Sequence, residues 1–408
     1  MSQIAMISFH TCPLASEEGK ETGGMNVYVL ELSRALTRMG HQVDIFTRSQ
    51  DEHNKAIVEV ADGLRVVHLV AGPQTRLNKK ELFPYLSEFV EHYNDFCKNN
   101  TISHAIIHAH YYLSGLIGLQ IKNRPMILSF HTLGLMKNLV ARNIEEKEDD
   151  KRIEAEMYLG KLAKKIVAPS KSDKNYLRYL YGVPQKTIEV IPPGVNTDLF
   201  RPMDMESAKK HIGLSMQDKM ILFVGRIEPL KGIDMLMYAM KIVTERNPDT
   251  KVCLCIVGGD ISQPQDAWSD TLRNLNAVRH TLNMSTTVTF VGQKSQEMLP
   301  YYYNASEMVV MPSHYESFGM SALEAMSCGV PVITTNVAGV SSLIDETHSS
   351  LITSVNNPLL LATQIEHLLH LPEKRAAMRA DIRNNVLDLS WGNIADKMSA
   401  LYREVYEN

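Results

Sequence analysis

The chain has 408 residues, of which 44% are hydrophobic and 22% charged, and 42 Lys and Arg against 46 Asp and Glu leave a formal net charge of −4. A length of this order predicts two or three domains with apolar cores. The near-balanced charge excludes a global positive field that would hold nucleic acid or an anionic membrane. The average composition excludes a disordered or fibrous chain, which leaves a large globular enzyme or binding protein.

The five cysteines are scattered and show no zinc-ligand spacing, which predicts a reduced, cytoplasmic compartment. Cys253 and Cys255 alternate with Leu254 in an apolar run, so both are expected on one face of a buried strand. The chain starts with a strand-like run at Ile4–Phe9, and no window approaches the ~20 apolar residues that span a bilayer. We therefore expect a protein without an integral membrane segment.

In the first half, short β-rich runs alternate with helical patterns, which predicts βαβ units and a parallel sheet. The strand predictions are Ile4–Phe9, Gln42–Thr47, Leu64–Val70, Ala105–His110, Met126–Phe130, Lys165–Pro169 and Glu189–Ile191. Between the first two strands, apolar residues at Val29, Leu32, Leu36 and Met39 have helical spacing, and Gly40 ends the pattern. The acidic run Glu145–Asp150 is predicted to be a solvated loop or helix end.

The same alternation restarts in the second half and predicts a second α/β domain. Its strand predictions are Met220–Gly225, Val252–Gly258, Thr287–Gly292, Met308–Pro312 and Pro331–Thr335. Between the halves lies Ile191-Pro192-Pro193-Gly194, which continues neither a helix nor a central strand. We predict an α/β fold with domains at 1–190 and 205–388, a linker at 191–204 and a terminal helix within 389–408.

Unusual residues follow several first-half strands, at the sheet edge where parallel α/β folds bind ligands. His10 follows the first strand, and Gly23-Gly24 opens the next helix, where backbone N–H groups favour an anion. The alternative is a tight turn punctuated by glycine. His108, His110 and His131 also fall near strand ends, and several such histidines favour a site over isolated structural roles. A zinc cluster is the other alternative, although no partner carboxylate stands at metal spacing.

In the second half, Gly225-Arg226 ends a strand and Lys231-Gly232 opens the next helix. Two cations at a strand-to-helix turn suit a diphosphate, although two surface cations would give the same pattern. Glu316 lies in a glycine-bounded loop after a strand, and Glu324 follows on a helix. Carboxylates so placed accept hydrogen bonds from vicinal sugar hydroxyls, but the spacing alone carries no such meaning.

Together, Gly225-Arg226, Lys231-Gly232, Glu316-Ser317-Phe318-Gly319 and Glu324 resemble the donor site of retaining glycosyltransferases of family 4. The resemblance covers nearly the whole chain. It implies a GT-B fold of two facing Rossmann-like domains, with a terminal helix that crosses back to the first domain. It also implies a UDP-sugar donor, no cofactor required for the chemistry, and a front-face mechanism in which a donor phosphate oxygen acts as base. Mg²⁺ is compatible with such a site but is not predicted.

The N-terminal half resembles the D-inositol 3-phosphate glycosyltransferases of that family, through His10-Thr11-Cys12-Pro13-Leu14 and Gly23-Gly24-Met25-Asn26. In that group Lys, Tyr, Thr and Arg hold the acceptor phosphate, and the matching positions are Lys79, Tyr111, Thr132 and Arg152. Lys80 stands beside Lys79 and offers the same charge. Cys12 replaces the usual Ser, and the loop between Asn138 and Arg152 departs from the group's pattern.

The resemblance thus implies three sets of site residues. The donor set is Gly24, Arg226, Lys231, Glu316, Ser317, Phe318, Gly319 and Glu324. The acceptor set is His10, Asn26, Lys79, Tyr111, Thr132 and Arg152. The catalytic set is His131, Arg226, Lys231 and Glu316. No metal ligands are predicted.

The implied reaction moves a hexosyl group, GlcNAc or Glc, from a UDP-sugar to a small phosphorylated polyol or sugar such as inositol 3-phosphate. Phe83-Pro84-Tyr85-Leu86 and the motif around Arg152 also resemble sucrose-phosphate synthases, which implies fructose 6-phosphate as the alternative acceptor. A UDP-GlcNAc 2-epimerase and a non-catalytic nucleotide-sugar-binding protein are further alternatives. No nucleic acid or membrane partner is expected, and a homodimer is compatible with the sequence.

Overall fold

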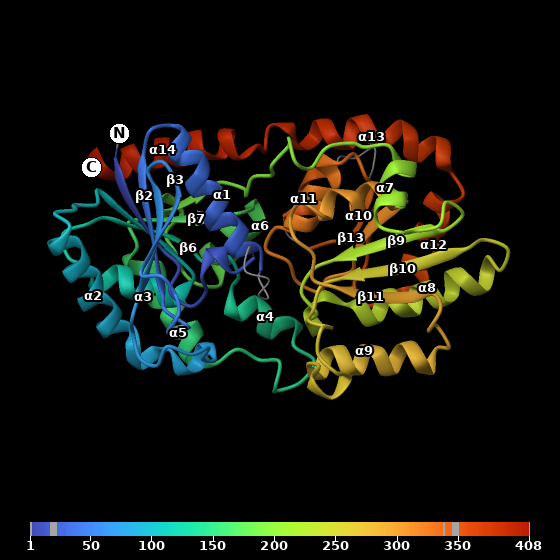
Figure 1. Ribbon diagram of the computed structural model, residues 1–408, viewed down its shortest axis with the longest axis horizontal. Coiled ribbons are helices and arrows are strands. Elements are labelled where there is room, and N and C mark those ends of the chain that lie inside the picture. The colour runs from blue at the N-terminus through green and yellow to red at the C-terminus, as the bar shows by residue number, and fades with distance from the viewer. Residues whose placement is uncertain (1, 17–22, 338, 345–350, 408) are drawn as a thin grey trace. The chain divides into compact units, whose positions relative to one another are not determined.

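The computed structural model describes residues 2–16, 23–337, 339–344 and 351–407, which divide into two compact units. Unit 1 takes its described residues from Met1–Leu139, Lys147–Gly194 and Trp391–Asn408, and unit 2 from Val140–Glu146 and Val195–Ser390. Figure 1 shows one twisted sheet in each unit. In the described part of the chain, no helix is long and apolar enough to span a membrane.

The sheet of unit 1 has the strand order β3-β4-β2-β1-β5-β6-β7-β8 among the described residues. Its strands are β1 (Gln3–Ile7), β2 (Gln42–Arg48), β3 (Ile57–Ala61), β4 (Leu64–Leu69), β5 (Ile106–His110), β6 (Met126–Ser129), β7 (Lys165–Ala168) and β8 (Ile188–Val190). Neighbouring strands run parallel from β4 through β8, and β3 pairs antiparallel with β4 at the edge. Because the inner strands are buried on both faces, they read as continuous apolar runs.

The helices of unit 1 cover both faces of this sheet. They are α1 (Gly24–Arg38), α2 (Leu86–Asn99), α3 (Tyr112–Gln120), α4 (Gly134–Val140), α5 (Asp150–Leu162), α6 (Lys171–Tyr179) and α14 (Trp391–Glu407). Figure 1 shows α2, α3 and α5 on one face, while α1 and α14 pack together on the other. Helix α1 ends as predicted, because Gly40 adopts a left-handed φ of 89° that does not continue a helix.

Unit 2 has the strand order β11-β10-β9-β12-β13-β14 among the described residues, and every pair in it is parallel. Its strands are β9 (Lys219–Val224), β10 (Val252–Val257), β11 (Val288–Gly292), β12 (Met308–Met311), β13 (Val332–Thr335) and β14 (Ile352–Thr353). Its helices are α7 (Met205–His211), α8 (Ile233–Arg246), α9 (Asp270–Thr281), α10 (Leu299–Ala305), α11 (Met320–Ser327), α12 (Pro358–Leu369) and α13 (Pro372–Leu387). Helices α8 and α9 lie on one face, and α7 and α10 on the other (Figure 1).

The prediction of two parallel-sheet α/β parts is confirmed, whereas β3 and β14 were not predicted. Strand β3 has only partly buried and exposed residues and lies at the sheet edge, so its apolar alternation is interrupted by charge. Strand β14 has two residues and pairs only with β13 among the described strands. Both are too short or too polar to show a clear strand pattern.

Two of the places where the chain passes between the units, Gly194–Val195 and Ser390–Trp391, lie side by side. Val195 donates its backbone N–H to Leu389 O over 2.8 Å and forms an isolated bridge with Ser390, both inside unit 2. In unit 1, a Cβ on Gly194 would stand 2.6 Å from the Trp391 ring. Glycine is therefore required where the chain leaves unit 1, because a larger residue would collide with the start of α14.

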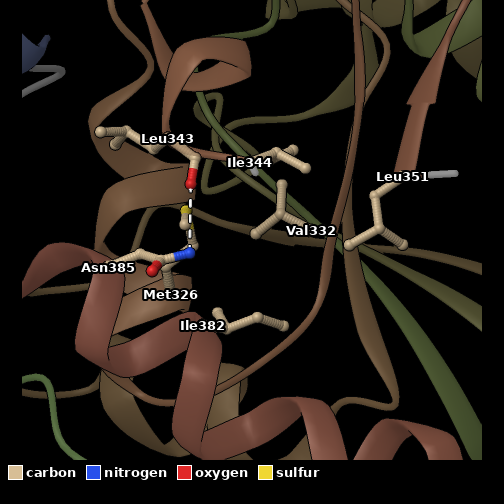
Figure 2. Close-up of a pocket in the computed structure, with 7 residues that line it drawn as sticks. All are labelled: Met326, Val332, Leu343, Ile344, Leu351, Ile382 and Asn385. Atoms are coloured by element: carbon tan, nitrogen blue, oxygen red, sulfur yellow. Dashed lines mark hydrogen bonds between the residues drawn. The ribbon is translucent and has the colours of Figure 1, made fainter. Parts of the chain in front are cut away.

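A small apolar cavity of about 10 Å³ lies in unit 2 between α11, β13 and α13 (Figure 2). Met326, Val332 and Ile382 line it, and the Asn385 amide donates to Leu343 O over 3.3 Å at its side. None of the predicted site residues lines this cavity. Its volume admits about one water molecule, and its lining offers few polar groups to orient a ligand, so we interpret it as a packing gap.

Candidate functional sites

The predicted residues of unit 1 follow neighbouring strands. His10 comes three residues after β1, Tyr111 directly follows β5, and His131 comes two residues after β6. Because β1, β5 and β6 are adjacent and parallel, their carboxyl ends lie at one edge of the sheet. The rings of His10 and Tyr111 accordingly lie 4.4 Å apart, centre to centre. Chain order reverses between β1 and β5, which is where ligands bind in open α/β sheets.

Two of these residues hold a backbone conformation that side-chain-bearing residues rarely adopt. Tyr111 has φ 78° and His131 has φ 63°, both in the positive range. Such strain persists where the surrounding structure imposes it, and it occurs often at binding and catalytic sites. Here both positive φ angles occur just after the ends of β5 and β6.

The four predicted phosphate-binding residues gather in unit 1, and we call Lys79, Tyr111, Thr132 and Arg152 the Arg152 cluster. Arg152 Nη2 donates to the backbone O and to Oγ1 of Thr132, each over 3.0 Å. The guanidinium carbon lies 4.8 Å from the Tyr111 ring centre, and Lys79 Nζ lies 5.4 Å from the same centre. Lys79 is thus the lysine of the pair that the structure places against Tyr111.

Carboxylates that were not predicted complete the surroundings of Arg152, which is 3% exposed. Arg152 Nε donates to Glu156 Oε1 over 2.7 Å, and Arg152 Nη1 lies 2.8 Å from Glu148 Oε1. Lys137 Nζ pairs with that same Glu148 oxygen. Burial favours the neutral acid, but the charges of Arg152 and Lys137 outweigh it and lower the pKa of Glu148 to about 2. Glu148 is therefore ionised at neutral pH.

The acidic run was predicted to be solvated, and this is wrong for Glu148, whose side chain is 20% exposed and paired with two cations. The i, i+4, i+8 spacing of Glu148, Arg152 and Glu156 was the available signal, because it puts the three on one side of a helical segment. The contribution of Lys137 depends on tertiary packing between α4 and the start of α5, which no local pattern shows.

His131 belongs to a row of neutral imidazoles at the ends of β5 and β6. His110 Nδ1 lies 3.0 Å from His131 Nε2, and His108 Nδ1 lies 2.7 Å from the Tyr402 hydroxyl on α14. Burial lowers the pKa of all three histidines well below the usual range. They act as neutral hydrogen-bonding groups, and the described residues contain no group of three side chains that could hold a metal ion.

Gly24 and Asn26 lie at the start of α1. Gly24 is its exposed first residue, after Gly23 in extended conformation. Asn26 is 2% exposed, and its amide donates to Cys12 O over 2.8 Å and to Thr11 Oγ1 over 3.0 Å. In this structure Asn26 thus holds the loop after β1, a supporting contact rather than an exposed binding group.

In unit 2, the predicted cations follow β9. Arg226 Nη1 pairs with Glu228 Oε1 over 2.6 Å within the same turn. Lys231 ends a short 3-10 helix, Pro229–Lys231, and its Nζ forms an ion pair with Glu316 Oε2. The structure therefore brings Lys231 and Glu316 together from the ends of β9 and β12, adjacent strands in the sheet.

The glycine after Lys231 makes this approach possible. Gly232 has φ 64°, and a Cβ there would stand 2.3 Å from the backbone O of Pro312, just after β12. His314 N donates to Leu230 O over 2.8 Å and closes the same contact. Only glycine satisfies both the left-handed conformation and the close approach.

Glu324, on α11, is 6% exposed and accepts a hydrogen bond from the Tyr303 hydroxyl over 2.7 Å. Burial raises the pKa of Glu324 to about 7, even though this hydrogen bond favours the ionised form. The carboxyl group is thus poised between its neutral and charged states at neutral pH.

The residues between the two glutamates form the turn into α11. Gly319 precedes the helix with φ 98°, and the Ser317 Oγ lies 3.2 Å from the Tyr315 hydroxyl. Phe318 is 5% exposed, and its backbone O accepts from Val340 N over 2.8 Å. No direct contact between Arg226 and either glutamate occurs among the contacts of the described residues.

Two family models together match most of the chain. "Glycosyltransferase Family 4" matches residues 22–199, and "Glycosyl transferases group 1" matches residues 204–385. The D-inositol 3-phosphate glycosyltransferase of Corynebacterium diphtheriae is 32% identical over 406 residues, covering 98% of this chain and 94% of that protein. The enzyme of the same name from Rhodococcus erythropolis is 33% identical over 410 residues, covering 100% of this chain and 92% of that protein.

Solved structures agree with the family. The sucrose-phosphate synthase of Thermosynechococcus elongatus is 31% identical with a TM-score of 0.89, and each chain covers 100% of the other. HepE of Anabaena, solved in complex with UDP-glucose, is 16% identical with a TM-score of 0.76 over 99% of this chain and 100% of that one, and shares the fold. Two parallel-sheet α/β units, glycosyltransferase models over both halves and full-length relatives above 30% identity lead to one conclusion: the chain has the GT-B fold, belongs to glycosyltransferase family 4 and is a hexosyltransferase.

Proposed function

We propose that the enzyme transfers a hexosyl group from a UDP-sugar to a hydroxyl of a small phosphorylated polyol, with inositol 3-phosphate as the first candidate. The observation that carries the acceptor class is the Arg152 cluster, in which Lys79, Arg152 and two hydroxyl-bearing side chains converge. Each phosphate oxygen favours charge-assisted donors, and this set supplies them. The two D-inositol 3-phosphate glycosyltransferases described above support inositol phosphate as the acceptor.

The donor class rests on unit 2. Arg226 and Lys231 stand at a strand-to-helix turn that suits a diphosphate, and Glu316 and Glu324 are carboxylates that accept hydrogen bonds from sugar hydroxyls. In our proposal Lys231 turns from Glu316 to the diphosphate, Glu316 binds the hexose, and Glu324 binds the ribose. The UDP-glucose complex of HepE, a protein of the same fold, is in keeping with a UDP-sugar donor.

The proposed reaction retains the configuration of the sugar. The bond between the anomeric carbon and the diphosphate oxygen breaks with its electron pair on UDP, and the acceptor oxygen bonds to the same face of that carbon. The acceptor proton passes to a phosphate oxygen of the donor. Arg226 and Lys231 stabilise the negative charge that develops on the leaving diphosphate, which is the largest contribution we assign to the protein. Neutral His131 contributes a hydrogen bond to the donor sugar, and Gly24 a backbone N–H to the donor.

Fructose 6-phosphate is the second candidate acceptor, favoured by the sucrose-phosphate synthase relative at 31% identity over the whole chain. Both candidates carry a phosphate monoester, so both use the Arg152 cluster. They differ in the ring that this cluster positions beside the reacting carbon.

The test measures UDP release with UDP-Glc and UDP-GlcNAc against inositol 3-phosphate, fructose 6-phosphate, free inositol and free fructose. We expect turnover with one phosphorylated acceptor and at least about tenfold lower kcat/KM with its free counterpart, since one charge-assisted contact contributes about 1.5–3 kcal/mol. Equal turnover of phosphorylated and free acceptors would contradict the proposal. NMR of the product's anomeric centre tests retention, and an inverted centre would overturn the mechanism.

A further inference from the structure

Most N–H donors of the Arg152 guanidinium already have partners in the protein, so few are open to a phosphate. Of its five N–H donors, Nε is directed to Glu156 and two on Nη2 to Thr132. Glu156 is fully buried and also accepts from Gly134 N over 2.9 Å and from the Tyr181 hydroxyl over 2.7 Å. These contacts fix the orientation of the guanidinium. An anion that approaches Arg152 directly must therefore come to Nη1, where Glu148 already lies.

Glu148 occupies that position as a phosphate oxygen would. Its Oε1 lies 2.8 Å from Arg152 Nη1 and pairs at the same time with Lys137 Nζ. Glu148 is also held less tightly than Glu156, because its side chain is 20% exposed whereas that of Glu156 is buried. The backbone N–H of Glu148 is bound to Asn138 Oδ1 over 2.7 Å, so the side chain can swing away without moving the loop.

The charges of the side chains around Arg152 also indicate that a bound phosphate replaces Glu148. The ion pairs around Glu148 join Lys137 and Arg152 to Glu148 and Glu156, so these four side chains carry two positive and two negative charges and are neutral together. When Glu148 moves away, Lys137 and Arg152 remain against Glu156 alone, which leaves one net positive charge for the incoming phosphate. A dianion beside a retained Glu148 would instead face like charge within a few ångströms, which is unfavourable in a partly buried site.

We propose that the Glu148 carboxylate holds the place of the acceptor phosphate, and that a phosphate monoester binds by displacing it and taking over both Arg152 Nη1 and Lys137. This inference rests on the proposed function and adds two residues to it. Glu148 makes the site selective, because only an anion that binds Arg152 and Lys137 more tightly than the Glu148 carboxylate does can replace it. Lys137 becomes a phosphate ligand in the bound state. Unphosphorylated polyols and weak carboxylate ligands are thereby discriminated against.

The experiment uses Glu148→Gln in the full chain, with Glu145→Gln as the matched control. Glu145 is an exposed member of the same acidic run, so the control removes the same formal charge three residues away. Isothermal titration calorimetry measures the Kd of inorganic phosphate, and initial rates give KM for inositol 3-phosphate, fructose 6-phosphate and UDP-sugar. We expect Glu148→Gln to lower both the Kd of inorganic phosphate and the KM of the phosphorylated acceptor about tenfold. The KM of the UDP-sugar should stay unchanged, and Glu145→Gln should behave like the wild type.

Lys137→Met is the second variant, and it is informative even if Glu148→Gln folds poorly. We expect Lys137→Met to raise the Kd of inorganic phosphate about tenfold, because it removes a phosphate ligand. A higher acceptor KM in Glu148→Gln would mean that Glu148 stays and binds the acceptor's hydroxyls, which overturns the proposal. An unchanged phosphate Kd in either variant overturns it as well.

Failure of the inference and failure of the proposed function give different results. If wild-type protein binds phosphate but turns over no phosphorylated acceptor, the proposed function is wrong, while the displacement is still judged by the two variants' phosphate Kd. If phosphorylated acceptors turn over but neither variant alters phosphate binding, the displacement alone is wrong.

Discussion

Tyr303 donates its hydroxyl hydrogen to Glu324 Oε2 over 2.7 Å in the interior of unit 2. A phenol in this position favours the ionised carboxylate, while burial favours the neutral acid, and burial prevails to raise the pKa of Glu324 to about 7. The residue that we propose to bind the ribose therefore changes charge within the pH range in which enzymes are assayed.

The donor KM should depend on this titration. An ionised Glu324 accepts hydrogen bonds from two ribose hydroxyls, whereas the neutral acid uses one oxygen as a donor. We expect the KM for UDP-sugar to fall about tenfold as pH rises from 6 to 8, following the ionised fraction. In Glu324→Gln the same measurement should give a higher but pH-independent KM. An equal pH dependence in both proteins would show that another group titrates.

The same pKa predicts a pH dependence of stability. Because Glu324 binds its proton more tightly in the folded state than at the ordinary value of 4.5, its favourable contribution is fully present below about pH 4.5 and is lost as pH rises through 7. The free energy of unfolding should fall by about 3 kcal/mol across that window. Urea unfolding at pH 5 and pH 7.5 measures it, and Glu324→Gln should lack this component of the fall. A parallel loss in the variant would contradict the assignment.

Arg152→Lys should raise the KM of the phosphorylated acceptor about 10–100-fold and leave the donor KM within about twofold. A lysine keeps the charge but loses the fork whose Nη2 engages Thr132 while Nη1 is offered to the phosphate. Steady-state kinetics with both substrates varied measure this. Arg178→Ala, at an exposed arginine on α6, is the control. A change confined to the donor KM would refute the acceptor assignment, and thermal unfolding shows whether the variant is folded.

Lys231→Met should lower kcat about 10²–10³-fold, because it removes a cation that stabilises charge on the departing diphosphate. Lys241→Met, at a lysine on α8 that pairs with Glu245, should leave kcat unchanged. The ion pair with Glu316 adds a second expectation: Glu316→Gln should also impair turnover, since it removes the proposed hexose contact. A wild-type kcat in Lys231→Met would exclude its catalytic role.

A comparison of Gly232→Ala with Gly213→Ala separates the cost of a left-handed backbone from the cost of a steric collision. Gly213 has φ 70° with nothing within 4 Å of a Cβ, whereas at Gly232 the Cβ would stand 2.3 Å from Pro312 O. Gly213→Ala should therefore cost only about 1–2 kcal/mol for the left-handed conformation. Gly232→Ala should cost several kcal/mol more and reduce kcat, because Lys231 moves with the turn. Equal unfolding free energies for the two variants would contradict the close approach.

Much of the fold followed from local patterns, because a parallel sheet buries both faces of its strands and each strand then reads as a short apolar run. The strands from Gln42 to Arg48 and from Val252 to Val257 were predicted to within a residue for this reason. Ile57–Ala61 escaped prediction because an edge strand lacks that burial.

The candidate sites were predictable as far as single residues at strand ends. Lys79 and Arg152 came from resemblance to known motifs, and the structure then placed both against Tyr111. The ionic partners were harder to predict, because Glu148 lies in a run whose composition suggests solvent, and only the packing of α4 brings Lys137 to it. Which charged residues neutralise one another inside a site depends on tertiary packing, which the local sequence pattern does not show.

The chain leaves unit 1 after Gly194 and returns to it at Trp391, which determines the order in which the parts of unit 1 are synthesised. Unit 2 is synthesised before α14, yet α14 supplies the Tyr402 hydroxyl to His108 over 2.7 Å and the Ser399 hydroxyl to His41 over 2.9 Å in unit 1. During synthesis, the residues of unit 1 that precede Val195 therefore lack the apolar face of α14 until Val195–Ser390 has been made. The half of the enzyme that is translated first is thus completed last, when α14 packs on it.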